Sequence, residues 1–342
     1  MFTQYYTAAN TQEENGGIYG YDRNSEQTFF EPLRGASYLA FSPDKTLLYA
    51  VSRNSSDCLA SVYQIREDGS LILRDQRATH GKATCHLTTD PSGRFLYCAN
   101  YLTGNFNEFR LKNGLFQGPE SERMITLHGK LGPNPDRQTS SHAHCTVFTP
   151  DGKYLCVVDL GLDEVQLFPF SRETGVTETP SFCYRSERPG AGPRHLLFSP
   201  DGTTAWLANE VDNTVSVLHY ESGTLTHRQT LSTLPEDFTE KNTVAAVRLS
   251  ADGNFLCVSN RGHNSFACYR VDDQNGLTLH DIIPCGGAGP RDVNFLPDEK
   301  TFACCNENSN DVTYFQYNQL DGSFTPLSLK QLLPGPLCLV YC

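Results

Sequence analysis

A phrase that returns six times along the chain constrains its fold more than any other feature. Each copy contains an apolar stretch, a turn like Pro-Asp-Gly, a second apolar stretch and a polar pair, as in HLLFSPDGTTAWLANE at 195–210. The six turns begin at residues that lie 48, 59, 50, 51 and 46 positions apart, namely Pro43, Pro91, Pro150, Pro200, Ala251 and Pro297. This period is typical of a four-stranded β-propeller blade. The repeat therefore predicts a radial array of blades.

The two ends of the chain complete the array. The segment GPLCLVYC from Gly335 resembles the start of a blade, such as GPRHLLF from Gly192, and it ends after one strand. The stretch YYTAANTQEENGGIYGYDRN at 5–24 resembles the second and third strands of a blade. Joined together, they would remove the open sheet edge of a linear array. We expect one all-β domain over residues 1–342: a seven-bladed β-propeller with one blade closed by strands from both chain termini.

Charge and hydropathy limit the partners of the chain. It has 39 acidic and 27 basic residues and a formal net charge of −12, which gives no extended positive surface for nucleic acid. The sequence has no apolar run of 18 residues, and MFTQYYTAANTQ lacks a basic start followed by an apolar stretch. We therefore expect no nucleic-acid partner, no membrane association and a cytoplasmic location. The sequence gives no indication of the oligomeric state.

The 13 cysteines are scattered along the chain. Several fall in the second strand of a repeat, where a small side chain packs well between sheets: Cys98, Cys156, Cys257 and Cys304. No pair of CxxC motifs is present, so a structural zinc site is not expected. These features predict buried free thiols.

Antiparallel geometry indicates where function lies. The starts of the inner strands and the ends of the second strands share the face opposite the Pro-Asp turns. Six positions before the turns stand Ser37, Cys85, His144, Arg194, Ala245 and Arg291, and ten positions after them stand Arg53, Tyr101, Leu160, Glu210, Arg261 and Glu307. Guanidinium groups suit phosphate or carboxylate. The alternative is that these arginines pair with Glu210 or Glu307 and form a rigid, inert hub.

Longer phrases resemble a known family. They are GPRHLLFSPDGTTAWLANEVDNTVSVLHY (192–220), HAHCTVFTPDGKYLCVVDLGLDEVQLF (142–168), AAVRLSADGNFLCVSNRGHNSFACYRV (245–271) and LPEDFTEKNTVAAV (234–247). Together they are similar to the seven-bladed, propeller-type 6-phosphogluconolactonases over almost the whole chain. The resemblance implies hydrolysis of 6-phospho-D-glucono-1,5-lactone to 6-phosphogluconate in the oxidative pentose phosphate pathway, so a phosphorylated sugar lactone is the expected small-molecule partner.

Hydrolysis of a lactone needs a positioned water, a proton acceptor and donors for the oxyanion, and no G-x-S-x-G elbow is present. The candidate catalytic residues are His144, Glu210 and Arg194. Either His144 or Glu210 is the base, with a preference for an imidazole that titrates near neutrality. The candidate substrate-binding residues are Arg53, Tyr101, Arg261, Arg291, Asn209 and Glu307. We expect His195 to face away from the site and to be wedged between blades.

Three other functions fit parts of the pattern. A metal-dependent lactonase would use oxygen ligands such as Glu210, Asn209, Asp159 and Asn260. The surrounding arginines would repel a cation, so neither a metal nor another cofactor is expected. The remaining two are an enzyme like a carboxymuconate cyclase and a noncatalytic propeller that binds proteins through one face of its disc.

Overall fold

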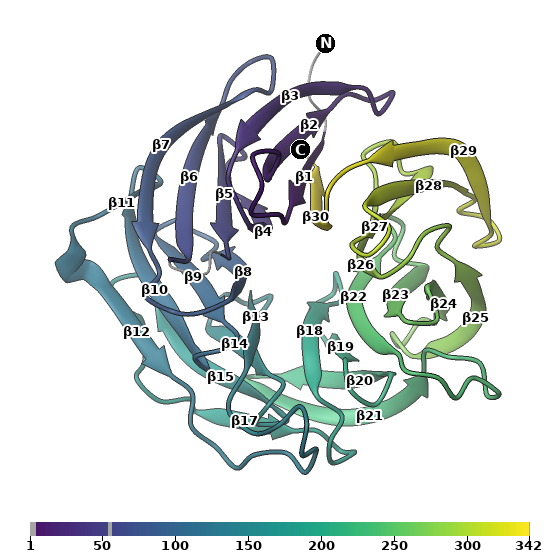
Figure 1. Cartoon of the computed structure of the whole chain (residues 1–342). Coiled ribbons are helices and arrows are strands. Elements are labelled where there is room, and N and C mark those ends of the chain that lie inside the picture. Colours follow the sequence, from purple (N-terminus) through teal and green to yellow (C-terminus); the bar gives the residue numbers. More distant parts are fainter. Residues whose placement is uncertain (1–4, 54–56, 342) are drawn as a thin grey trace.

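The computed structural model describes residues 5–53 and 57–341, and these residues form seven antiparallel sheets arranged around an axis (Figure 1). Each sheet is a blade, and in blades 1 to 6 the first strand along the chain lies nearest the axis. The prediction of a seven-bladed β-propeller is confirmed.

Blades 1 to 3 follow the chain in order. Blade 1 contains β4 (Ala36–Phe41), β5 (Leu47–Ser52), β6 (Leu59–Ile65) and β7 (Leu71–Ala78). Blade 2 contains β8 (Thr84–Thr89), β9 (Phe95–Asn100), β10 (Asn105–Lys112), β11 (Leu115–Phe116) and β12 (Glu122–Thr126), with the short 3-10 helix η1 (Pro119–Ser121) before β12. Blade 3 contains β13 (Ala143–Phe148), β14 (Tyr154–Asp159), β15 (Glu164–Ser171), β16 (Gly175–Val176) and β17 (Phe182–Arg185).

Blades 4 to 6 are regular four-stranded sheets. Blade 4 contains β18 (Pro193–Phe198), β19 (Thr204–Asn209), β20 (Thr214–Glu221) and β21 (Thr224–Ser232). Blade 5 contains β22 (Thr243–Leu249), β23 (Phe255–Arg261), β24 (Ser265–Val271) and β25 (Leu277–Pro284). Blade 6 contains β26 (Pro290–Phe295), β27 (Thr301–Asn306), β28 (Asp311–Tyr317) and β29 (Phe324–Leu332).

Blade 7 joins the two ends of the chain, as predicted. Its strand order is β3 (Gln27–Pro32), β2 (Gly17–Tyr21), β1 (Tyr5–Ala9) and β30 (Pro336–Tyr341), so the C-terminal strand lies innermost beside β1 (Figure 1). The pairing of β1 with β30 is antiparallel and runs from Tyr5 with Tyr341 to Ala9 with Pro336. This pairing completes a blade that packs against both blade 6 and blade 1, so it closes the ring.

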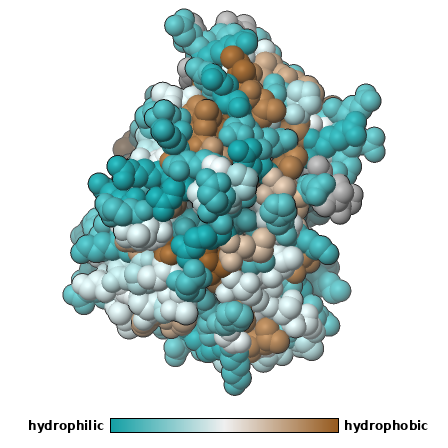
Figure 2. All heavy atoms as spheres, turned by 90° about the vertical axis from the view of Figure 1, so that its left-hand side faces the viewer, coloured by the Kyte–Doolittle hydropathy of each residue, from teal (hydrophilic) through white to brown (hydrophobic). Residues whose placement is uncertain are grey.

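The hydrophobic core lies between neighbouring blades. Trp206 of blade 4 is fully buried and packs with Val258 and Tyr269 of blade 5. The twelve cysteines that the structure describes are free thiols, of which all but Cys183 are buried. On the rim that carries β7 and β12, hydrophobic groups are separated by hydrophilic ones (Figure 2). Among the described residues, no helix has both the length and the apolar character needed to cross a bilayer.

Candidate active site

A β-bulge in every inner strand brings one ring of side chains to the axis. In β18, Pro193 pairs with Asn209 and His195 with Ala208, so Arg194 is the extra residue. The same shift in the other blades makes Ser37, Cys85, His144, Arg291 and Leu337 extra residues, and it falls between Val244 and Val247 in β22. A bulge redirects the side chain that it carries. The residues six positions before the turns therefore gather at one end of the axis.

Backbone hydrogen bonds hold the second ring beside the first. The N–H of Glu210 donates to the carbonyl oxygen of Gly192 at 2.7 Å, two residues before Arg194. The N–H of Arg53 makes the matching bond to Gly35 at 2.7 Å. Gly192 has a φ of 63°, and a Cβ at that position would lie 2.3 Å from Cγ2 of Val211. Glycine is therefore required where the chain turns into this bulge.

Glu210 is the centre of the site. Its Oε2 lies 2.9 Å from Nη2 of Arg261, 3.1 Å from Nε of Arg194 and 3.9 Å from Nε2 of His144. Its Oε1 accepts a hydrogen bond from Arg137. The Glu210 side chain is only 6% exposed. One buried carboxylate thus binds three guanidinium groups that come from three different parts of the chain.

The electrostatics of this cluster fix its charge state. Burial alone would raise the pKa of Glu210, but Arg261, Arg194, His144 and Arg137 hold it well below its ordinary value. Burial, together with Arg261 and Arg291, lowers the pKa of Arg194 to about 9. Burial and Arg194 also hold the pKa of His144 well below 6.5, although Glu210 opposes them. At neutral pH the carboxylate is charged and His144 is neutral.

The expectation that His144 titrates near neutrality is therefore wrong for the free protein. Its environment contains more positive than negative charge, which disfavours the imidazolium form. The ring of His144 lies near that of Tyr101, with centroids 5.4 Å apart, and its Nδ1 is 3.8 Å from Sγ of Cys85. Burial raises the pKa of the Cys85 thiol to about 11, so this thiol is also neutral.

A second group of charges lies around Arg53. Nη1 of Arg291 donates to Oε2 of Glu307 at 3.1 Å. No described residue hydrogen-bonds or ion-pairs with the Arg53 guanidinium. Burial and the repulsion of Arg291 lower the pKa of Arg53. The arrangement favours an added negative charge beside Arg53 and Arg291.

These residues line one cavity of about 350 Å³. Its lining comprises Arg53, Cys85, Tyr101, Arg137, His144, Glu210, Thr243, Arg261 and Arg291. Two further charged residues contact this lining: Arg194 pairs with Glu210, and Glu307 pairs with Arg291. Five guanidinium groups thus face two carboxylates, which leaves an excess of three positive charges. The inert-hub alternative accounts for the ion pairs of Glu210 and Glu307 but does not account for this excess.

Arg137 is a site residue that the sequence patterns did not predict. It lies in the loop between β12 and β13, where its Nη2 donates to the Tyr101 hydroxyl at 3.2 Å and to Glu210. Nε2 of Gln138 anchors this loop by donating to the carbonyl oxygen of Leu160 at 2.9 Å. The only hint in the sequence is the interval of 59 residues between Pro91 and Pro150, the longest of the five, because such an insertion provides a long loop.

Asn209 does not lie with the other candidate residues. Its Nδ2 donates to Oγ1 of Thr214 at 2.9 Å and to Oγ of Ser216 at 3.0 Å. Asn209 is one residue before Glu210, and successive residues at a strand end point in different directions. The structure thus gives Asn209 a place within blade 4 instead of on the cavity. Asp159 is likewise bound locally, by the N–H groups of His142 and Leu162.

The expectation for His195 is wrong in one respect: the side chain does not line the active-site cavity, as expected, but it is not wedged between two blades. Its Nε2 lies 3.1 Å from Nη1 of Arg194, and its ring lies 5.4 Å from that of His86 and 5.6 Å from that of His144. It therefore sits where inner strands of several blades converge, instead of between two blades. The bulge at Arg194 interrupts the alternation of the strand, so two consecutive side chains approach the axis.

No group of three or more His, Cys, Asp or Glu side chains suited to a metal ion occurs in the described parts of the chain. The oxygens of Glu210 are occupied by guanidinium groups, and Asp159 accepts hydrogen bonds from Ser141 and backbone N–H groups.

Known proteins are similar to this chain in both sequence and architecture. The family described as Lactonase, 7-bladed beta-propeller, matches residues 4–341. A 6-phosphogluconolactonase of Bacillus subtilis is 31% identical, with 98% of this chain and 97% of the relative covered. The structure of a periplasmic gluconolactonase of Pseudomonas aeruginosa, PpgL, superposes with a TM-score of 0.91 at 27% identity, over 99% of this chain and 98% of that one.

A protein of Lactobacillus plantarum superposes with a TM-score of 0.88 at 30% identity, and each chain is covered completely. The family match extends over all seven blades and includes every residue of the cavity. The chain therefore belongs to the seven-bladed β-propeller lactonases and is a lactone-hydrolysing enzyme of the carboxylic ester hydrolase class.

Proposed function

We propose that this lactonase hydrolyses 6-phospho-D-glucono-1,5-lactone to 6-phosphogluconate, the lactone step of the oxidative pentose phosphate pathway. The observation that carries the proposal is the excess of three positive charges in the cavity. A phosphate dianion and the oxyanion formed during hydrolysis together carry three negative charges. A sugar lactone without phosphate would leave at least two positive charges unbalanced in a partly buried site.

The names of the relatives do not distinguish between a phosphorylated and an unphosphorylated lactone as the substrate. The Bacillus subtilis relative is called a 6-phosphogluconolactonase, whereas the Pseudomonas aeruginosa structure is called a periplasmic gluconolactonase. The phosphate is therefore the point at which our proposal differs from the nearest alternative. A cytoplasmic location is part of the proposal, because the oxidative pathway supplies this lactone inside the cell.

The anionic end of the substrate would bind beside Arg53 and Arg291. Arg53 is the guanidinium with no hydrogen bond or ion pair to a described residue, and the repulsion between the two arginines favours an anion there. Arginine forks bind phosphate oxygens in a bidentate manner. The lactone ring would then extend across the cavity to the cluster around Glu210.

We assign the role of general base to His144. Glu210 is a weak base because three guanidinium groups hold its pKa well below its ordinary value. The 3.9 Å between Nε2 of His144 and Oε2 of Glu210 exceeds a direct hydrogen bond. A water molecule between them would contact both. A bound phosphate dianion would also offset the positive charges that now lower the pKa of His144, which makes the imidazole a better base when substrate is present.

The reaction then has two steps. The water oxygen attacks the lactone carbonyl carbon while His144 accepts a water proton, and Arg194 and Arg261 stabilise the oxyanion. The bond between the carbonyl carbon and the ring oxygen breaks next. The imidazolium returns its proton to the ring oxygen, which leaves as the 5-hydroxyl group. The product is an open-chain carboxylic acid that ionises in water, and no covalent intermediate with the protein is formed.

A coupled assay tests the proposed substrate. Freshly prepared phosphorylated lactone is supplied, 6-phosphogluconate is followed with its dehydrogenase, and spontaneous hydrolysis is subtracted. We expect kcat/KM for the phosphorylated lactone to exceed that for glucono-1,5-lactone by at least about a hundredfold, since two buried charge-assisted contacts are lost without the phosphate. Equal values for the two lactones would refute the phosphate site. Activity that disappears in EDTA and returns with a divalent cation would favour the metal-dependent alternative.

A further inference from the structure

A second large cavity lies far from the proposed reaction, on the face of the Pro-Asp turns. It has a volume of about 920 Å³ and lies between blades 1 and 2, with one side formed by the turn between β15 and β16 of blade 3. The turn between β4 and β5 and the turn between β8 and β9 line it, so it opens at the opposite ends of the strands from the active site. Its size is within the range of small-molecule sites.

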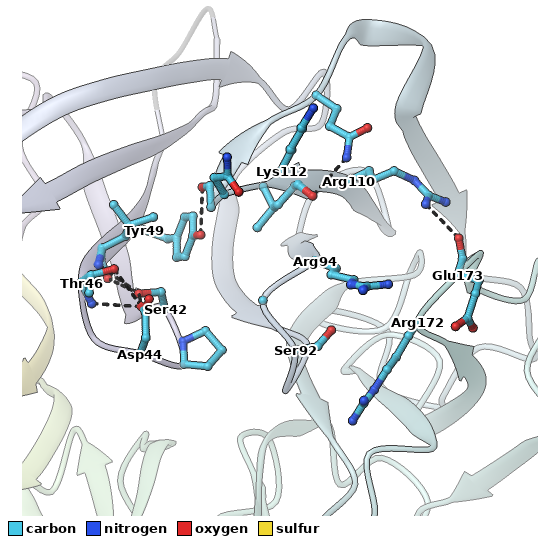
Figure 3. A pocket seen from close by; sticks show the side chains of 17 residues that line it. Ser42, Asp44, Thr46, Tyr49, Ser92, Arg94, Arg110, Lys112, Arg172 and Glu173 are labelled. Atoms are coloured by element: carbon cyan, nitrogen blue, oxygen red, sulfur yellow. Dashed lines mark hydrogen bonds between the residues drawn. The ribbon is translucent and has the colours of Figure 1, made fainter.

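Basic side chains gather on one side of this cavity. Figure 3 shows Arg94, Arg110, Arg172 and Glu173 together, opposite Ser42, Asp44, Thr46 and Tyr49. Lys112 also lines the cavity. Four basic groups therefore face two carboxylates in a chain whose formal net charge is −12. The cavity therefore has a local excess of positive charge, although the chain as a whole is negatively charged.

The carboxylates in the cavity are not used to neutralise the basic groups. Oδ1 of Asp44 accepts hydrogen bonds from Oγ of Ser42 at 2.6 Å and from Oγ1 of Thr46 at 2.8 Å. Oε2 of Glu173 accepts one from Oγ of Ser171 at 2.9 Å. Arg94, Lys112 and Arg172 form no ion pair with any residue that the structure describes. Their donors are therefore free to bind a ligand.

Two of the basic residues of this cavity, Arg110 and Arg94, are held in position by their surroundings. The guanidinium of Arg110 lies 4.8 Å above the ring of Phe95, and its Nη1 donates to the carbonyl oxygen of Glu173 at 2.8 Å. The turn that carries Arg94 is held by Asp90, whose Oδ1 accepts the N–H groups of Arg94 and Phe95, both at 2.7 Å. Two arginines thus project from restrained positions, which lowers the entropic cost of binding an anion.

We propose that this cavity is a second, noncatalytic binding site for a phosphate-bearing small molecule. Arg94, Arg110 and Arg172 would bind the phosphate oxygens, with Lys112 adding charge and Ser42 and Thr46 on the opposite wall available to polar groups of the ligand. The excess of two positive charges matches the charge of one phosphate dianion. This site is independent of the proposed lactone substrate, because it shares no residue with the cavity around Glu210.

Chemical footprinting of arginines tests the site directly. The whole protein is modified with p-hydroxyphenylglyoxal in the presence and absence of millimolar pyrophosphate, and each arginine is followed by peptide mass spectrometry. We expect pyrophosphate to protect Arg94 and Arg172 and to leave the exposed Arg228 of β21 unaffected. Equal modification of Arg94 and Arg172 with and without pyrophosphate, or equal protection of Arg228, would overturn the proposal. Parallel samples with inorganic phosphate and with ATP identify whether the phosphate group alone or a nucleotide is preferred.

A double variant separates this site from the active site. In Arg94→Gln/Arg172→Gln, calorimetric binding of pyrophosphate to the turn face should weaken at least about tenfold, because two charge-assisted contacts are lost. The value of kcat/KM for the lactone should stay within about twofold of wild type, since distant sites act independently. The matched control is Arg228→Gln/Lys300→Gln, which removes the same charge from exposed positions outside the cavity. Unchanged pyrophosphate binding in the first variant, or an equal loss in the control, would contradict a built site.

Discussion

The two faces of the disc use the same strands in opposite ways. On the turn face, four blades repeat one hydrogen-bond pattern around the aspartates Asp44, Asp151, Asp201 and Asp252. Each accepts a hydroxyl from two residues earlier at 2.5–2.6 Å and an N–H from two residues later at 3.0–3.1 Å. On the active-site face, the side chains that line the cavity follow no such repeat, as His144 of blade 3 and Glu210 of blade 4 show. Local bonds define the turns, whereas contacts between distant blades define the site.

This contrast has a physical origin. An Asp turn satisfies its own backbone and depends little on neighbouring blades. The site depends on bulges that bring Arg194 and His144 to the axis. It also depends on the Glu210 carboxylate, which is neutralised by Arg194 of its own blade, by Arg261 of blade 5 and by Arg137 from the loop between β12 and β13. Substitutions on the active-site face should therefore affect several blades at once, and those on the turn face should remain local.

The largest effect is expected for Glu210→Gln. Removing the central carboxylate leaves three guanidinium groups without their common partner, and breaking a buried ion pair typically costs about 3 kcal/mol or more. We expect kcat/KM to fall by roughly three orders of magnitude, with a lower free energy of unfolding in urea. Glu307→Gln is the matched control and should cost less, because Glu307 pairs with Arg291 alone within the ion-pair distance. A Glu210→Gln variant that keeps both activity and stability would contradict the central role of this carboxylate.

His144→Gln should mainly affect chemistry. A general base contributes roughly 10² to 10⁴ in rate, so we expect kcat to fall by at least about a hundredfold while KM changes little. Glutamine retains hydrogen bonding at a similar size, which makes misfolding less of a concern. If the His144→Gln variant had the same kcat as the wild type, another group would have to be the general base.

The pH dependence of stability should report the histidines at the axis. Burial and Arg248 lower the pKa of His86 to about 3, and burial and Arg194 hold those of His144 and His195 well below 6.5. The folded pKa is the lower one, so the unfolded state binds more protons and stability falls as pH drops below about 6.5. Each histidine contributes about 1.4 kcal/mol per pH unit well below that value. Asp212 opposes this trend because burial raises its pKa to about 6.

Urea unfolding at about pH 7 and about pH 5 measures this loss. His144→Gln should reduce the dependence on pH, since one buried imidazole is removed. A free energy of unfolding that is flat over this range would mean that the three rings are protonated in the folded protein.

The smallest effect is expected on the turn face. Asp201 receives hydrogen bonds from Ser199, Thr203 and Asn275, which lower its pKa to about 2. Asp201→Ala should reduce the free energy of unfolding by about 1 kcal/mol and leave kcat/KM unchanged. Loss of activity without loss of stability would show that the two faces are coupled.

The same contrast explains what the sequence could predict. The turn pattern repeats, so six blades and the two rings of residues could be predicted from its spacing. The seventh blade and its closure could be predicted because both chain ends resemble parts of a blade. Arg137 could not, because it reaches Glu210 from a loop without a repeat and its partner is 73 positions away. The position of His195 was also beyond a simple alternation rule, since the bulge beside Pro193 brings two consecutive side chains toward the axis. Alternation with Glu210, in contrast, explains why Asn209 does not reach the cavity.

The charge state of His144 was the second property of the site that could not be predicted from the sequence. Sequence spacing placed it near arginines and a glutamate, but the sign of its pKa shift depends on how completely it is buried and on which charges lie nearest. Such quantities follow from packing between blades and are not encoded in any local motif.

Arg53→Met gives the most direct test of the central claim that excess positive charge in the cavity binds the phosphate. Methionine keeps the apolar part of the side chain and removes the charge. The account predicts that kcat/KM for the phosphorylated lactone falls by about a hundredfold, while kcat/KM for glucono-1,5-lactone stays within about twofold of wild type. An equal fall for both lactones, or no fall for the phosphorylated one, would contradict it.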